Sequence, residues 1–168
     1  KQGGKLVDEE ILRITQGVTA GLSYAHAQGM VHCDIKPNNI LFDALGNPQL
    51  TDFGLTRAAQ VSRSMFTSIT VGGIGTPAYM APEMWEKPKV STAADQYSLG
   101  CIIYEMLTGQ QLFVGETTPI VMLKHFKPLA LPDDLPPTLQ AFFSKALAFM
   151  TEDRFENLAQ EKTALESS

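Results

Sequence analysis

The spacing of apolar residues predicts a first helix near the start of the chain. Asp8, Glu9 and Glu10 would place carboxylates at its positive end, and Gly29 stands where the helix should stop. Its buried face is marked by apolar residues at intervals of three or four: Ile11, Ile14, Val18, Leu22 and Ala25.

Three later segments are also predicted to be helical. Residues 95–107 are apolar on nearly every side, which indicates a buried helix and not an amphipathic surface helix. A short last helix is expected over residues 156–165. Between them, after Pro136 and Pro137, a further helical stripe consists of Leu139, Phe142, Phe143, Ala146, Leu147 and Met150.

A small β-hairpin is predicted after the first helix. Residues 40–42 and 49–51 are short apolar pieces, and residues 43–48 between them are rich in turn formers. Residues 55–75 have little periodicity and many Ser, Thr and Gly, which favours a mobile loop. The pattern as a whole predicts a mainly α fold with one hairpin.

Composition narrows the class of protein. With 168 residues, 44% hydrophobic and 18% charged, the chain is predicted to be one globular domain with its own core. A net charge of −5 argues against binding of nucleic acid or of an anionic membrane surface. Two cysteines are too few for a disulfide framework, which favours a cytoplasmic location. The longest apolar run, residues 99–107, is too short to span a bilayer.

One motif carries candidate chemistry. Residues 32–39 read H-x-D-x-K-x-x-N, Asp52-Phe53-Gly54 follows, and Ala81-Pro82-Glu83 comes later. Phosphoryl transfer needs positioning and charge stabilisation. Asp34 fits the carboxylate that orients a hydroxyl and accepts its proton, and Lys36 fits the cation near the transferring group.

The same motif offers ligands for a metal ion. Asn39 and Asp52 supply an amide oxygen and a carboxylate, the hard ligands that Mg2+ prefers, and the predicted hairpin would bring them together. Taken singly, each residue has a plainer interpretation, such as a turn carboxylate, a solvated charge or a cap. Their joint order favours the catalytic one. His32 is expected to be a buried, hydrogen-bonded ring, because Asp34 already fills the role of the base.

With these motifs the chain resembles the C-terminal lobe of eukaryotic-type (Hanks-type) serine/threonine protein kinases. Residues 75–83, which read G-T-P-A-Y-M-A-P-E, are similar to the substrate-side end of the activation segment and are close to bacterial members. The run from Asp95, D-Q-Y-S-L-G, is similar to the start of the central buried helix. Arg154 resembles the late arginine that pairs with the glutamate of Ala-Pro-Glu, here Glu83.

The resemblance implies a set of roles. Residues 1–168 would form a single large-lobe domain of an α+β parent, with the activation segment over 52–83. ATP and Mg2+, with Mn2+ as an alternative, would be the cofactors, and Ser/Thr hydroxyls of proteins the substrates. Asp95 would accept hydrogen bonds from the backbone of the catalytic loop (residues 32–39). The catalytic residues would be Asp34, Lys36 and Thr76, with Thr76 bonded to the other two. The nucleotide would bind at Lys36, Asn39, Leu41, Thr51 and Asp52. The metal ligands would be Asn39 and Asp52.

The chain departs from the family pattern in two places. Cys33 stands where many kinases have an arginine that binds a phosphate on the activation loop, so switching of that kind is not expected. Cys33 itself is expected to be a small packed residue. The small-lobe motifs, a Gly-rich loop and a Val-Ala-Ile-Lys strand, do not occur. Because the first residue is Lys1, the chain is expected to be a fragment whose small lobe, and any membrane anchor, lie outside it.

Three functions are compatible with these observations. The main hypothesis is a serine/threonine kinase whose isolated large lobe is inactive. The rival is a pseudokinase-like or excised-lobe binding module without catalysis, which the missing lobe favours for this chain alone. The third is a small-molecule kinase such as an aminoglycoside phosphotransferase, which shares a similar H-x-D and a later Asp but lacks the Ala-Pro-Glu region, and so ranks lowest. Under the main hypothesis, residues 62–70 are expected to be mobile and to be phosphorylated first.

Overall fold

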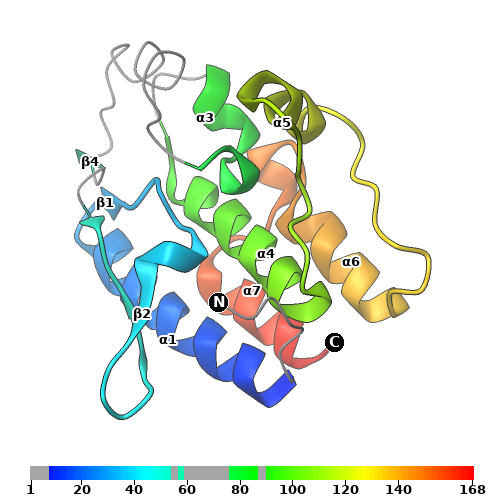
Figure 1. The fold of residues 1–168 in the computed structure, drawn as a ribbon. Coiled ribbons are helices and arrows are strands. Elements are labelled where there is room, and N and C mark those ends of the chain that lie inside the picture. Colours follow the sequence, from blue (N-terminus) through cyan, green and yellow to red (C-terminus); the bar gives the residue numbers. More distant parts are fainter. Residues whose placement is uncertain (1–7, 54–56, 59–75, 87–89) are drawn as a thin grey trace.

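The fold is organised around one buried helix. The computed structural model describes residues 8–53, 57–58, 76–86 and 90–168, and helix α4 (Thr92–Thr108) runs through their middle (Figure 1). Every residue from Ala94 to Tyr104 is buried, which confirms the predicted buried helix; it begins three residues earlier than expected. Gly109 ends it at φ 75°, where its N–H reaches the carbonyl of Glu105 at 2.8 Å.

Helix α1 (Asp8–Ala27) packs against α4 and α7 (Leu158–Glu166) as the apolar spacing predicts. All five residues of the predicted apolar face are buried, and Gly29 follows at φ 71°. α1 also supports the hairpin: a Cβ at Gly17 would overlap the ring of Pro48, so only glycine permits this approach.

The predicted hairpin is present. Strands β2 (Ile40–Phe42) and β3 (Pro48–Leu50) pair antiparallel, with Ile40 opposite Leu50; β3 begins one residue earlier than expected. A second antiparallel pair, β1 (Met30–Val31) with β4 (Arg57–Ala58), was not predicted. The 3-10 turn η1 (Pro37–Asn39) joins β1 to β2.

The remaining elements lie around α4 (Figure 1). α6 (Pro137–Ala146) ends earlier than the stripe suggested, so Met150 lies outside it and is exposed; α7 begins at Leu158, two residues later than expected. Helix α5 (Thr118–His125) was not predicted. The short elements are η3 (Pro77–Tyr79), α3 (Pro82–Glu86) and η4 (Thr151–Asp153). α6 and η3 are in contact with α4, α7 is packed on α6, and α5 is packed on η3 and α3.

The mainly α fold class with a small hairpin is confirmed. The expected mobile segment, including residues 62–70, lies almost wholly outside the described residues. Within the part of the chain that the structure describes, no helix combines the length and the apolar character needed to cross a membrane.

Candidate active site

Asp95, on the first turns of α4, holds the backbone of the catalytic loop. Its Oδ2 accepts the N–H of His32 at 2.9 Å, and its Oδ1 accepts the N–H of Cys33 at 2.9 Å. His26 donates its Nε2–H to the same carboxylate at 2.8 Å. Asp95 is completely buried, so these bonds fix the loop to the core helix, as the resemblance implied.

Two residues of the motif adopt left-handed backbone conformations. Cys33 has φ 67° and Asp52 has φ 66°, and they are the only non-glycine residues with positive φ in the described part of the chain. Such conformations cost roughly 1–2 kcal/mol each and persist where the surroundings enforce them. Cys33 is buried, which confirms a small packed residue, and the next residue, Asp34, is partly exposed.

His32 connects the catalytic loop to the strand that leads to Asp52. Its Nε2 lies 3.0 Å from the carbonyl of Thr51, and its Nδ1 accepts the N–H of Asp34 at 3.3 Å. Because a carbonyl only accepts, Nε2 carries the proton and donates it. The ring also packs on Phe53 at 4.7 Å. With both nitrogens engaged inside the protein, His32 has the structural role that the sequence analysis expected.

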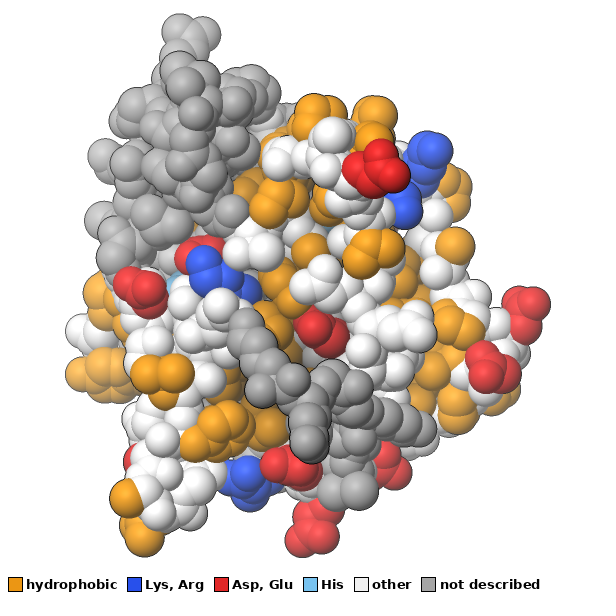
Figure 2. Space-filling view, viewed as in Figure 1, with side chains coloured by type: hydrophobic (Ala, Val, Ile, Leu, Met, Phe, Trp, Pro, Cys, Tyr) orange, Lys and Arg blue, Asp and Glu red, His pale blue; other side chains and the backbone are white. Residues whose placement is uncertain are grey.

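Asp34, Lys36 and Asn39 form one hydrogen-bonded cluster. Lys36 Nζ lies 2.6 Å from Asp34 Oδ2, and Asn39 Nδ2 donates to the carbonyl of Asp34 at 2.8 Å and to its Oδ2 at 3.2 Å. The η1 turn brings Asn39 back towards Asp34, helped by Pro37 at its first position. Figure 2 shows basic and acidic side chains together beside the segment between β1 and β2.

The arrangement fits a divalent cation. The carbonyl of Asn39 accepts both the N–H and the hydroxyl of Thr51, at 2.8 and 3.2 Å, so the hairpin places Asn39 beside the residue that precedes Asp52. The Nδ2 of Asn39 faces Asp34, and no described residue donates to its Oδ1, which remains an acceptor for a metal. An amide oxygen with an exposed carboxylate suits Mg2+, which takes its other ligands from water and phosphate. No group of three or more His, Cys, Asp or Glu side chains that could hold a metal ion occurs among the described residues.

The other predicted site residues make fewer contacts with the cluster of Asp34, Lys36 and Asn39. Leu41, on β2, is 54% exposed, and exposed hydrophobic side chains continue along the hairpin (Figure 2). Thr51 is half-buried on the side of Asn39. Among the described contacts, Thr76 makes no hydrogen bond to Asp34 or Lys36, so its proposed role stays a prediction.

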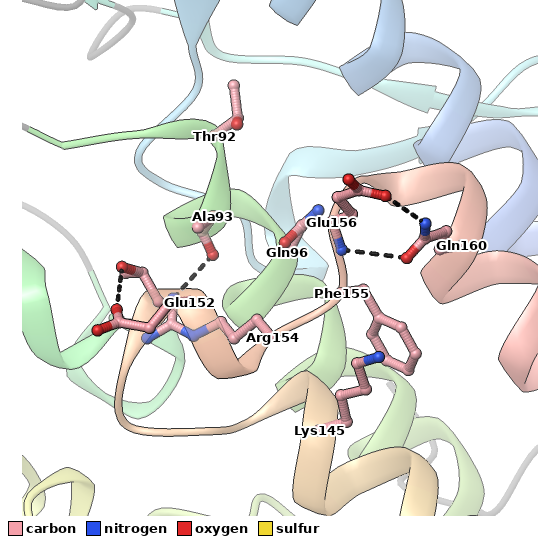
Figure 3. A pocket seen from close by; sticks show the side chains of 10 residues that line it. Thr92, Ala93, Gln96, Lys145, Glu152, Arg154, Phe155, Glu156 and Gln160 are labelled. Atoms are coloured by element: carbon pink, nitrogen blue, oxygen red, sulfur yellow. Dashed lines mark hydrogen bonds between the residues drawn. The ribbon is translucent and has the colours of Figure 1, made fainter.

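Glu83 and Arg154 pair as the resemblance implied. The guanidinium donates from Nη1 to Glu83 Oε1 and from Nη2 to Oε2, both at 2.8 Å. Its other N–H groups bond backbone carbonyls of Ala93, Ala148 and Phe149, so all five donors are used. Figure 3 shows the bond from Arg154 to Ala93. The guanidinium also lies 4.8 Å over the ring of Tyr97.

A shallow cavity of about 420 Å³ lies beside Arg154. Lys145 and Glu152 contribute to its lining, and Glu156 and Gln160 bond each other across its edge (Figure 3). Asp34, Lys36, Asn39 and Asp52 are not among its lining residues, and Arg154 has no donor left for a ligand. This cavity is therefore separate from the predicted nucleotide site.

Sequence reasoning missed the contacts that hold η3 in place. Ser98 donates its hydroxyl to the carbonyl of Tyr79 at 2.7 Å. The Tyr79 hydroxyl donates to Glu105 at 2.5 Å, and burial together with this carboxylate raises the pKa of Tyr79. His125 bonds the carbonyl of Pro77 at 2.8 Å. No sequence signal identifies these residues, because their partners lie 19 to 48 positions away.

The comparisons with known proteins agree with this geometry. The family described as "Protein kinase domain" matches residues 1–163. A probable serine/threonine-protein kinase PknB of Bifidobacterium longum is 33% identical over 168 residues, covering 97% of this chain and 24% of the relative. A probable serine/threonine-protein kinase of Streptomyces coelicolor is 33% identical over 170 residues, covering 98% and 25%.

A third relative is matched with similar identity and coverage. The serine/threonine-protein kinase PknB of Mycobacterium tuberculosis is 32% identical over 167 residues, covering 96% of this chain and 26% of the relative. The chain thus spans about a quarter of the length of the curated relatives it matches. The chain belongs to the protein kinase domain family, and the relatives it matches are bacterial serine/threonine-protein kinases.

Proposed function

We propose that this chain is the large catalytic lobe of a kinase that transfers the γ-phosphate of ATP to Ser/Thr hydroxyls of proteins. The observation that supports this most directly is the cluster in which Lys36 and Asn39 both bond Asp34. Asn39 in turn bonds Thr51, the residue before Asp52. Members of the family generally use ATP and a divalent metal ion.

Asp34 orients the substrate hydroxyl and receives its proton. As the bond between the substrate oxygen and the γ-phosphorus forms, the bond from that phosphorus to the bridging oxygen of ADP breaks. Lys36 stabilises the negative charge of the transferring group. Its present ion pair with Asp34, at 2.6 Å, places the cation within reach of the space in front of the carboxylate.

Asn39 and Asp52 would hold the metal ion, for which Mg2+ is proposed and Mn2+ is the alternative. The ion supplies neutralisation of phosphate charge. Leu41 and Thr51 would lie beside the adenine, and Thr76 would support the catalytic loop. In this proposal residues 1–168 act as one domain with residues 52–83 as the activation segment.

The small lobe of the same protein is the proposed partner of this chain. The relatives are about four times as long as the aligned region. The hairpin exposes Leu41, Phe42 and Leu45, apolar side chains that a second lobe would cover. The cytoplasmic location expected from the cysteine content stays a prediction.

The test compares two carboxylates in the longest protein that contains this chain. Asp34→Asn should lower the rate of phosphate transfer about 10²–10⁴-fold and keep Mg-ATP binding. Asp52→Asn should weaken nucleotide binding in the presence of Mg2+ but not in its absence. Asp133→Asn, an exposed carboxylate in a loop, removes the same charge and should change neither property.

Two outcomes would contradict the proposal. Equal loss of nucleotide binding in the Asp34 and Asp52 variants would remove the assigned roles. A wild-type protein that binds partners but transfers no phosphate would support the binding-module alternative. The chain by itself should show little or no transfer, and robust turnover by it that Asp34→Asn abolishes would refute the need for a second lobe.

A further inference from the structure

Helix α5 contacts the η3 turn through a buried histidine. His125, the last residue of α5, is 3% exposed, and its Nε2 lies 2.8 Å from the carbonyl of Pro77. Its Nδ1 lies 2.8 Å from the hydroxyl of Tyr97, on α4. The side chain therefore connects three elements that are separate in the sequence.

The direction of both hydrogen bonds follows from their partners. The carbonyl of Pro77 can only accept, so Nε2 carries the proton and donates it. Nδ1 is then an acceptor and takes the hydroxyl proton of Tyr97. The ring of Phe113 packs against His125 with centroids 3.9 Å apart and holds the plane of the imidazole. Burial lowers the pKa of His125 to about 4, which keeps the ring in this neutral form.

The η3 turn is fixed from two helices. Within the described residues, the hydrogen bonds that its carbonyls receive from side chains come from Ser98 on α4, to Tyr79, and from His125 on α5, to Pro77. The carbonyl of Pro77 also accepts the N–H of Met80, at 3.3 Å, within the turn itself. Loss of the bond from His125 would release one end of η3 and leave the other end held.

The same bonds continue into the buried ion pair. Tyr97, whose hydroxyl donates to His125, lies under the guanidinium of Arg154, which holds Glu83. Glu83 follows η3 by four residues. The anchors of the substrate-side end of the activation segment thus include Arg154 at Glu83 and His125 at Pro77, besides the bonds of Tyr79 to α4.

We propose that His125 is a positioning residue for the protein substrate: by donating to the carbonyl of Pro77 it fixes the shape of the η3 turn against which the Ser/Thr peptide binds. The hydrogen-bond geometry stands by itself, and its consequence for the substrate rests on the proposed function. His125 does not touch the reacting atoms in this proposal and acts only through the backbone of η3.

Two substitutions separate the two bonds of the ring. In His125→Gln the side-chain amide nitrogen can occupy the place of Nε2 and keep the bond to Pro77. In His125→Asn the side chain is too short for that bond, although its oxygen can still accept from Tyr97. The Asn variant is therefore the test and the Gln variant its matched control.

The kinetic experiment uses the longest protein that contains this chain, with myelin basic protein as the phosphate acceptor. His125→Asn should raise the KM for the acceptor about tenfold, the effect of one lost buried hydrogen bond, and leave the KM for ATP unchanged. His125→Gln should stay close to wild type. Equal changes in the two variants, or an equal rise in the KM for ATP, would overturn the proposal.

A second measurement does not depend on activity. Hydrogen exchange of residues 76–81 should become faster in His125→Asn and not in His125→Gln, because the Met80 N–H shares the carbonyl of Pro77. Equal exchange in both variants overturns the inference whether or not the protein transfers phosphate. A wild-type protein without transfer would overturn the proposed function instead.

A third variant covers the case in which His125→Asn does not fold. Tyr97→Phe removes one hydroxyl and leaves His125 in place, so the imidazole loses the partner that holds Nδ1 as the acceptor. The KM for the acceptor should rise about threefold, less than for loss of the Pro77 bond itself. An unchanged KM with unchanged exchange in residues 76–81 would overturn the proposal.

Discussion

Two short ion pairs among the described residues, each with a lysine or arginine, differ in how many of their hydrogen-bonding atoms stay available to a ligand. Asp34 and Lys36 lie 2.6 Å apart with 11% and 23% of their side chains exposed, whereas Glu83 and Arg154 lie 2.8 Å apart with 4% and 0% exposed. Both oxygens of Glu83 and all five donors of Arg154 have partners. Asp34 instead uses only Oδ2 in its bonds to Lys36 and Asn39.

Asp34 and Lys36 can therefore exchange each other for a ligand, whereas Glu83 and Arg154 cannot. A partly exposed pair gains little net stability, because water competes for each charge, and a ligand can replace either partner at small cost. A buried pair with every hydrogen bond satisfied is costly to break, because the remaining charge has no water to receive it. The first arrangement suits catalysis, and the second suits a fixed anchor.

The largest expected effect is on the buried pair. Glu83→Gln and Arg154→Met should each lower the free energy of unfolding by about 3–5 kcal/mol, because each leaves a buried group without its charged partner. The double variant should lose much less than the sum of the two single losses. Denaturant unfolding of the three variants measures this. Single losses below about 1 kcal/mol would show that the pair behaves like a surface pair.

A smaller effect is expected at Glu161, a buried carboxyl that lacks such an anchor. It is 1% exposed on α7, and neither oxygen has a hydrogen-bond partner among the residues that the structure describes. Burial raises the pKa of Glu161 well above its ordinary value of 4.5, although Arg154 opposes the shift. The folded state therefore holds this proton more tightly than the unfolded state.

The sign of the pH effect at Glu161 follows from this tighter proton binding in the folded state. Stability is lost as pH rises from about 4.5 towards the folded-state pKa. Glu161→Gln should remove this part of the pH dependence, and Glu161→Met should raise the free energy of unfolding at neutral pH by about 1–3 kcal/mol. Unfolding curves across pH measure both. The exposed Glu166→Gln is the control, and a Glu161→Met protein less stable than wild type would contradict the expectation.

The smallest effect on stability is expected at the pair of Asp34 and Lys36. Asp34→Asn should change the free energy of unfolding by less than about 1 kcal/mol, because the pair is partly exposed and Asn39 remains bonded to the backbone carbonyl of residue 34. Denaturant unfolding of this variant, alongside the Glu83 variant, tests the contrast directly. A loss as large as that of Glu83→Gln would show that Asp34 also anchors the fold.

The sequence allowed a good prediction of elements with a long repeating pattern. The apolar face of α1 repeats over several turns, and α4 is apolar on nearly all sides, so both helices were predicted. The hairpin was predicted from its turn residues. Helix α5 was missed because it is short and two of its apolar residues, Ile120 and Leu123, are exposed. The β1–β4 pair was missed because two-residue strands have no detectable alternation.

In the candidate site, too, contacts between residues close in sequence were predictable from the residues, and contacts between distant residues were not. Asp34, Lys36 and Asn39 are close in sequence, and their cluster follows from one local turn. The pairing of Glu83 with Arg154 and the bonds of Asp95 came from the resemblance, since 62 to 71 positions separate the partners. The bonds of His125 had no such guide, because a lone histidine in a short helix carries no recognisable pattern.

By itself, the sequence determined the order of the motif residues, the course of the main helices and hence the family, because these depend on local periodicity and on residue type. The tertiary structure alone decided which polar side chains are buried and which groups they hydrogen-bond. Burial makes an unpaired polar group expensive, so the packing of α4, α5 and η3 selects the partners of Tyr97, His125 and Pro77. The residues that carry the chemistry of the site are therefore close together in the sequence, whereas the contacts that hold them in place join distant segments.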